Sequence, residues 1–145
     1  MLDINSNSLY KDVLMEHYNN SKTENLTDNK KIWSIKNPMC GDEISLQIDI
    51  NNNVIKDIYY NAKGCLISMA SCSIMKDNLI NKTIDEAIET INNYVKMIKG
   101  EKCEHCRCLK DAAALKGICN FPARFKCATI AWEGILNALN EIKNS

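Results

Sequence analysis

Residues Asp42 to Cys65 are DEISLQIDINNNVIKDIYYNAKGC, and this stretch decides the fold. Apolar side chains alternate with polar ones on both sides of the asparagines at 51–53, which is the pattern of two half-buried strands joined by a tight turn. The stretch therefore predicts an antiparallel hairpin with one face against a core. Residues 32–36 are predicted to add a third strand. Gly64 and Cys65 end the hairpin, and helical spacing begins after them.

Apolar residues recur at helical spacing in four further segments, each predicted to be a helix: 9–18, 67–79, 84–98 and 127–142. The first helix is short and has Leu14 and Tyr18 among its apolar positions. The third begins at a capping box in residues 83–86. A further brief helix is predicted to end at Lys116, with Gly117 as its C′ residue.

These elements predict the α+β class, a small three-stranded antiparallel sheet packed by helices, in one domain over residues 1–145 with a cysteine-rich insertion near 101–120. Eighteen basic and eighteen acidic residues cancel and no basic stripe interleaved with aromatics appears, so nucleic acid is not expected as a partner. The apolar residues are too dispersed for a membrane span, so a membrane is not expected either. The N-terminal sequence has no export signal, which favours the cytoplasm. Eight cysteines in that reducing compartment indicate metal or sulfur chemistry, or else small buried core residues.

Three distant cysteines lie where a loop meets a regular element, and an aspartate follows the first of them two residues later. Cys40, Cys65 and Cys127 supply soft thiolates, and Asp42 supplies a harder oxygen that leaves a metal more easily. The set predicts a zinc or iron–sulfur site with one exchangeable corner. The alternative is three buried cysteines and an aspartate that caps a turn.

Several ordered motifs resemble the SufU type of the IscU/NifU N-terminal scaffold family: Leu9-Tyr10-Lys11, His17-Tyr18, Asn37-Pro38-Met39-Cys40-Gly41-Asp42, the stretch 64–71 and the stretch 121–129. The resemblance implies a three-stranded sheet packed by helices, iron–sulfur cluster assembly, and a metal site made of Cys40, Asp42, Cys65 and Cys127. Lys126 stands where IscU-type members have histidine. Residues 121–125 replace the signature to which a dedicated Hsp70 chaperone docks, so that chaperone is not expected as a partner.

The resemblance further implies that a cysteine desulfurase, of the SufS or the IscS type, delivers sulfur to this site. Cys40 and Cys127 are the expected acceptors, with Arg124 and Lys126 supporting docking or the change of charge. A labile [2Fe-2S] cluster would be built there and passed to downstream apoproteins or carriers. The alternatives are a zinc-dependent sulfurtransferase that builds no cluster and a zinc-stabilised interaction module. Whether the chain is a scaffold or an enzyme, and whether it forms a homo-oligomer, is left open.

Extra cysteines that ordinary SufU-like chains lack are concentrated after residue 100. They supply enough soft ligands for a second Zn²⁺ or iron–sulfur cluster, although a sulfur relay and no role at all are the alternatives. The candidate second-site residues are Cys103, Cys106, Cys108 and Cys119, with His105 beside them. Cys72 is assigned to core packing and His17 to the surface or packing of the first helix.

Overall fold

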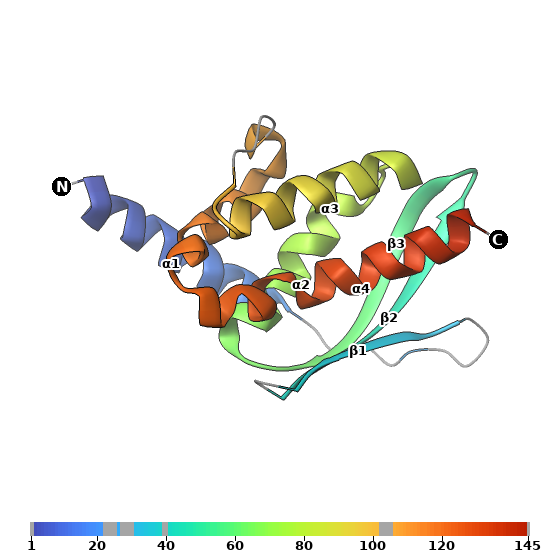
Figure 1. Ribbon diagram of the computed structural model, residues 1–145, viewed down its shortest axis with the longest axis horizontal. Coiled ribbons are helices and arrows are strands. Elements are labelled where there is room, and N and C mark those ends of the chain that lie inside the picture. The colour runs from blue at the N-terminus through green and yellow to red at the C-terminus, as the bar shows by residue number, and fades with distance from the viewer. Residues whose placement is uncertain (1, 22–25, 27–30, 39–40, 102–105, 145) are drawn as a thin grey trace.

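The predicted hairpin is present as two long strands, and the remaining elements assemble around it (Figure 1). The computed structural model describes residues 2–21, 26, 31–38, 41–101 and 106–144. The helices and strands are α1 (Leu2–Asn20), β1 (Trp33–Asn37), β2 (Asp42–Asn51), β3 (Val54–Lys63), α2 (Leu66–Leu79), α3 (Ile84–Ile98), η1 (Cys106–Asn120), η2 (Pro122–Arg124) and α4 (Phe125–Lys143), of which η1 and η2 are 3₁₀ helices.

The sheet has the strand order β1-β2-β3, and both pairs are antiparallel. Leu46 of β2 lies opposite Tyr60 of β3 and, on its other side, opposite Trp33 of β1. Asn52 and Asn53 make the turn between the long strands with φ of 54° and 66°, a left-handed conformation that asparagine tolerates better than most residues. The predicted α+β class with a three-stranded antiparallel sheet is confirmed.

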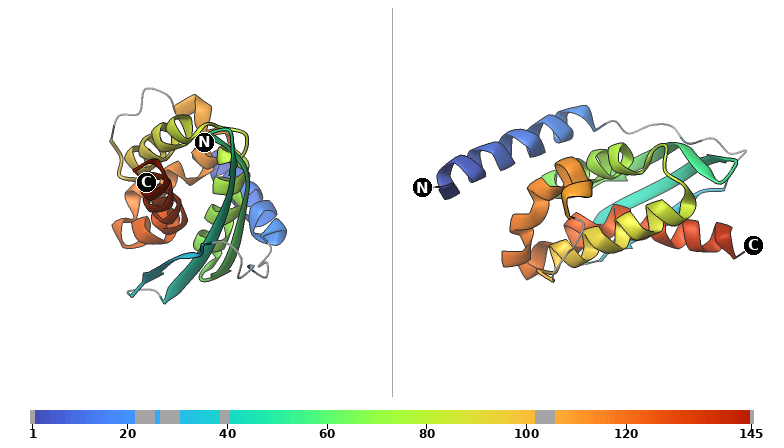
Figure 2. Two further views of the ribbon diagram at one scale, coloured as in Figure 1. Left: turned by 90° about the vertical axis from the view of Figure 1, so that its right-hand side faces the viewer. Right: turned by 90° about the horizontal axis from the view of Figure 1, so that it is seen from above.

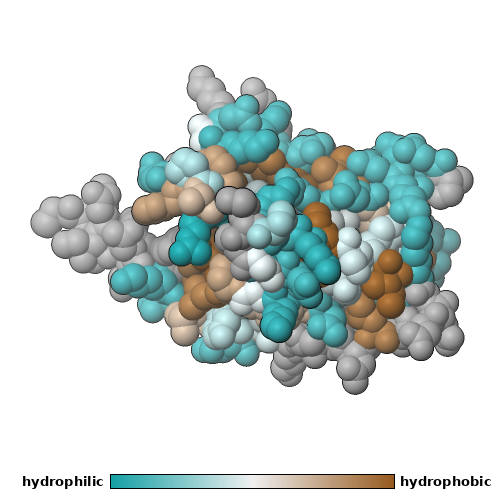
Figure 3. Space-filling model, turned by 60° about the horizontal axis from the view of Figure 1, so that its bottom comes forward, coloured by the Kyte–Doolittle hydropathy of each residue, from teal (hydrophilic) through white to brown (hydrophobic). Residues whose placement is uncertain are grey.

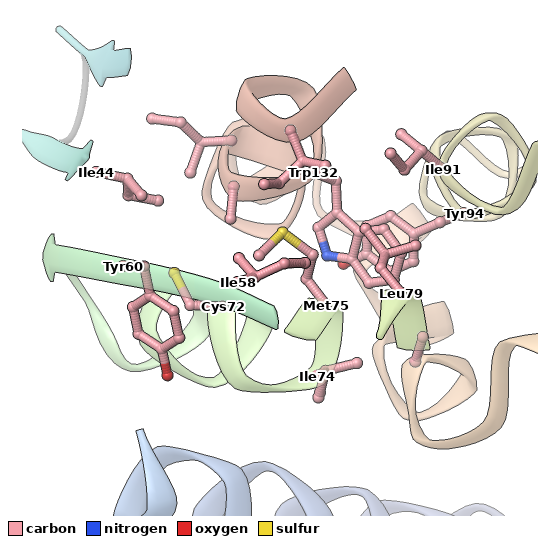
Figure 4. Packing of buried hydrophobic residues seen from close by; sticks show 14 of the residues in the cluster. Ile44, Ile58, Tyr60, Cys72, Ile74, Met75, Leu79, Ile91, Tyr94 and Trp132 are labelled. Atoms are coloured by element: carbon pink, nitrogen blue, oxygen red, sulfur yellow. The ribbon is translucent and has the colours of Figure 1, made fainter. Parts of the chain in front are cut away.

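Helices α2 and α4 cover one face of the sheet, and α3 packs on them from outside (Figure 2). The core between these layers is formed by side chains that alternate along β2 and β3 and by the inward faces of the helices (Figure 4). Its largest fully buried side chains are Trp132, Tyr94, Ile44, Leu46, Ile55, Ile58, Ile74, Met75, Leu79, Ile91 and Ile98. The start of β2, the end of β3 and the starts of α2 and α4 gather at one end of the sheet (Figure 1).

The first helix is longer than predicted, and the face that it buries matches the predicted one only in part. It begins at Leu2 and packs against α2 through Leu14 and His17, which are 4% and 5% exposed. His17 Nδ1 lies 2.9 Å from the Ser73 hydroxyl. Tyr18, predicted on the apolar face, is instead 41% exposed, because it lies about 100° around the helix from His17.

The segment before η2 also differs from its prediction. A brief helix ending at Lys116 was expected, but 3₁₀ turns continue through Gly117 to Asn120. Among the described glycines only Gly41 and Gly100 have positive φ, so Gly117 is not a left-handed C′ residue. Gly100, with φ of 79°, does end α3 as predicted.

The outer edge of β3 is partly covered at its start by the link between α2 and α3. Ile55 N donates to Lys82 O and Asn81 N donates to Ile55 O, both at 2.8 Å, while Val54 and Thr83 form an isolated antiparallel bridge. The link therefore pairs with the first two residues of β3, as a short additional strand would.

Exposed large apolar side chains come from different parts of the chain: Met15, Tyr18, Ile32, Leu66 and Phe121. On the face shown in Figure 3, hydrophobic areas are separated by hydrophilic ones. Across the described ranges, the structure contains no helix with the length and hydropathy that crossing a membrane requires.

Candidate metal centre

Asp42 is a buried carboxylate at the start of β2. Its side chain is 0% exposed, and Oδ1 accepts a hydrogen bond from the backbone N–H of Cys65 at 3.2 Å. Among the residues that the structure describes, Oδ2 has no hydrogen-bond partner. A buried carboxylate oxygen is costly unless a donor or a cation satisfies it, so this atom indicates a site for a positive ligand.

Cys65 is the N-cap residue of α2, and its backbone is extended, with φ of −73° and ψ of 173°. Its half-buried Sγ lies 3.5 Å from the Ser68 hydroxyl. Burial alone would raise the pKa of the Cys65 thiol, but hydrogen bonds from the side chain and backbone of Ser68 and from Cys127 outweigh it, and the pKa is lowered from its usual value. The helix N-terminus favours a thiolate in the same direction.

Cys127 is the third residue of α4 and is fully buried. The ligand atoms of Asp42, Cys65 and Cys127 all lie within 4.8 Å of one another. Two sulfur ligands of one tetrahedral zinc ion lie about 3.8 Å apart, so a small contraction would bring these three donors onto one ion. Their chemistry, two thiols and a buried carboxylate, fits zinc or iron–sulfur iron.

Gly64 allows this arrangement because it has no side chain. A Cβ at this position would lie 2.5 Å from Asp42 Oδ1 and 3.1 Å from the Cβ of Ser68. The sequence identified Gly64 only as the end of the hairpin. Its second role depends on a tertiary contact with Asp42. The role of Ser68, three residues after Cys65, depends on a local contact that sequence reasoning also missed.

The two basic residues expected to support the site lie on the surface at the start of α4. Arg124 ends η2 and is exposed. Lys126 is half-exposed, and its Nζ donates to Glu133 Oε2 at 2.7 Å, two turns further along the helix. That ion pair was not expected from the sequence, although the seven-residue spacing puts both side chains on one face of α4.

Cys40, the predicted fourth ligand, lies outside the described residues. Cys103 and His105 also lie outside them, as do the side chains of the other second-site candidates, Cys106, Cys108 and Cys119. That Cys40 completes the first site, and that the later cysteines form a second, therefore stay predictions.

Cys72 belongs to the core, as predicted. It is a residue of α2, is 0% exposed and lies in the apolar core cluster (Figure 4). Burial, assisted by the charge of Asp42, raises the pKa of its thiol to about 12. Such a thiol is a poor nucleophile and a poor ligand at neutral pH.

Comparison with known proteins gives consistent matches. Residues 9–128 match the family described as NifU-like N terminal domain. The chain is 34% identical to the zinc-dependent sulfurtransferase SufU of Bacillus subtilis, over 90% of this chain and 89% of the relative. It is also 34% identical to the iron–sulfur cluster assembly scaffold protein IscU of Thermotoga maritima, over 92% and 94%.

A solved structure is similar in fold as well. It is the putative iron–sulfur cluster assembly scaffold protein for the SUF system from Fervidobacterium islandicum, with a TM-score of 0.81 and 30% identity. The match covers 88% of this chain and 93% of that one.

Proposed function

Because the chain belongs to the family of NifU-like N-terminal domains, we propose that it accepts sulfur and carries cargo in iron–sulfur cluster assembly at the Asp42, Cys65 and Cys127 site. The family predicted from the motifs is confirmed. So is the predicted class of function, since the relatives are iron–sulfur cluster scaffolds and a zinc-dependent sulfurtransferase.

One observation supports the proposal most directly, the buried Asp42 carboxylate beside two thiols. One of its oxygens has no hydrogen-bond partner in the described part of the chain, and the ligand atoms of Cys65 and Cys127 lie within 4.8 Å of it and of each other. We propose Cys40 as the fourth ligand. A metal bound by this set would hold the cysteines as thiolates, which are the reactive form toward sulfur. Asp42, as the oxygen ligand, would dissociate from the metal most easily and so open the site.

The proposed donor is a cysteine desulfurase of the SufS or IscS type, and the proposed acceptors are Cys40 and Cys127. The acceptor thiolate attacks the outer sulfur of the desulfurase persulfide, a new S–S bond forms, and the old one breaks to release the desulfurase thiolate. Cys127 is fully buried, so its reaction requires the site to open at Asp42. Arg124 and Lys126, exposed at the start of α4, would contact negatively charged groups on the desulfurase.

Sulfur uptake by single variants tests the proposal. The full chain is prepared without oxygen and incubated with the desulfurase and cysteine, and protein-bound sulfane sulfur is measured. We expect Cys127→Ser to lose uptake. The matched control is Cys72→Ala, a buried cysteine outside the site, which should take up sulfur as the wild type does. Equal uptake by the wild type and Cys127→Ser would remove Cys127 from the reaction.

A second candidate function is a zinc-dependent sulfurtransferase that passes sulfur on without building a cluster. The similarity to the Bacillus subtilis protein of that name favours it, as does the presence of Lys126 directly before Cys127. Metal and acid-labile sulfide analysis of the chain prepared without oxygen distinguishes the two. Zinc without sulfide would support the sulfurtransferase, and iron with an equal amount of sulfide would support the scaffold.

A second metal site in the cysteine-rich segment is a separate proposal. It rests on the spacing of Cys103, Cys106 and Cys108, with Cys119 as a further soft ligand. Replacing the first three together with serine should lower the metal bound per chain without emptying the Asp42 site. Equal metal and sulfide in the wild type and the triple variant would refute this second site. We also propose a cytoplasmic location, because a reducing compartment keeps such thiols available.

A further inference from the structure

A buried hydrogen-bonded cluster forms around the backbone carbonyl of Ala128, the residue that follows Cys127. The hydroxyls of Ser71 and Tyr94 both donate to the backbone carbonyl of Ala128, each at 2.7 Å. Nε1 of Trp132 donates to the Ser71 oxygen at 2.9 Å. The rings of Tyr94 and Trp132 stack with centroids 3.8 Å apart and an interplanar angle of 8° (Figure 4). We call these three side chains, with the Ala128 carbonyl, the Ser71 cluster.

The cluster connects the elements that supply Cys65 and Cys127, the two thiols of the candidate metal centre. Ser71 is on α2, the helix that begins directly after Cys65, and Ala128 directly follows Cys127 in the first turn of α4. Tyr94 adds a link from α3. All four residues are 0% exposed, so these hydrogen bonds form away from water, where they are strong and costly to break.

We propose that Ser71 and Tyr94 are positioning residues that hold α2 and α4 at the spacing at which Cys65 and Cys127 bind one metal ion. This inference rests on the proposed function. Apolar packing between the helices is non-directional and tolerates small slides or rotations. A bound metal ion does not tolerate such movements, because its bonds to the ligands keep their lengths to within about 0.2 Å. Two hydroxyls on one carbonyl supply the directional constraint that packing lacks.

The role of the two hydroxyls predicts a graded effect of their removal. Ser71→Ala removes the bond to Ala128, the acceptor for Trp132 and the 3.4 Å contact with the Tyr94 hydroxyl, whereas Tyr94→Phe keeps the ring stack and removes the bond to Ala128 and that same contact. Both changes leave every proposed metal ligand in place. A loss of affinity would therefore come from the position of the thiols and not from a missing donor.

Cobalt binding to the metal-free full chain tests the inference. The dissociation constant for Co²⁺ is measured by competition, and the visible d–d and thiolate-to-metal bands report the geometry of the bound ion. We expect Ser71→Ala to weaken binding about 10-fold and to shift the d–d bands, as changes around metal ligands commonly do. Tyr94→Phe should move both readouts in the same direction by less.

The matched control is Ser73→Ala, on the same helix as Ser71. The Ser73 hydroxyl is hydrogen-bonded to His17 of α1, not to α4, so this variant should bind cobalt with wild-type affinity and spectrum. If Ser71→Ala fails to fold, Tyr94→Phe decides. Wild-type affinity and spectrum in the folded Ser71 and Tyr94 variants would overturn the inference, as would an equal loss in the control. A wild type that binds cobalt but accepts no sulfur would refute only the proposed function.

Discussion

Replacing Gly64 with alanine should damage the metal centre without touching a ligand. The new Cβ would lie 2.5 Å from Asp42 Oδ1 and 3.1 Å from Asp42 Cγ, closer than such contacts allow. Relief requires the carboxylate to move away from the Cys65 N–H. Overpacking costs about 1–3 kcal/mol, and a lost hydrogen bond to a charged group about 1.5–3 kcal/mol. The metal-free chain should therefore lose about 3 kcal/mol of stability, and zinc affinity should fall about 10- to 100-fold.

Two measurements and one control decide the matter. Urea unfolding of the metal-free chain gives the loss of stability, and competition with a chromophoric chelator gives the zinc dissociation constant. Gly117→Ala is the matched control, because no atom of the described residues lies within 4 Å of its added Cβ and its φ is not positive. It should keep wild-type zinc affinity and gain up to about 1 kcal/mol of stability. A Gly64→Ala chain as stable and as tight for zinc as the control would refute the reasoning.

Three further results are expected. Gly134→Ala should lower stability by about 1–3 kcal/mol in urea unfolding, because its Cβ would lie 2.7 Å from Leu46 Cδ1 where α4 meets the sheet; no change would mean that the helix can move away freely. In the metal-free chain, Cys65 should be alkylated at lower pH than an ordinary thiol, since its lowered pKa increases the thiolate fraction. Cys72 has a pKa of about 12 and thus a thiolate fraction of about 10⁻⁴ at pH 8, so it should stay unmodified until the chain unfolds; peptide mass spectrometry measures both. Thr83→Ala should lower the melting temperature by about 2–4 °C because it breaks the capping box of α3, and an unchanged temperature would show that the cap does not matter.

Local patterns predicted the elements around the site well. The alternation after Asp42 predicted β2 and β3, and the capping box at Thr83 predicted the start of α3, with both of its hydrogen bonds present. These signals depend on residues a few positions apart. Asp42, Cys65 and Cys127 were also identified from the sequence, and the structure brings their ligand atoms together.

Most of the contacts that sequence reasoning missed join distant parts of the chain. No local pattern pairs Ser71 with the carbonyl of Ala128, or places the absent Cβ of Gly64 against Asp42. The face of α1 was predicted only in part for the same reason: Leu14 is buried as expected, but packing against α2 also buries the polar His17 and leaves Tyr18 exposed. The sequence predicted a brief helix between Cys108 and Lys116, but not that the turns would be 3₁₀, begin at Cys106 and continue past Gly117 to Asn120.

The pairing of the α2–α3 link with β3 has a consequence for how copies of the chain behave at high concentration. An open strand edge is a template on which another chain can add a strand and begin to aggregate. Here the backbone of Ile55 is already paired with Asn81 and Lys82, so that end of β3 offers no such template. The opposite edge belongs to β1, which has only five residues and carries Lys36 with an exposed side chain. Short, charged edges of this kind disfavour strand addition, so β1 and the start of β3 are both protected against edge-to-edge association.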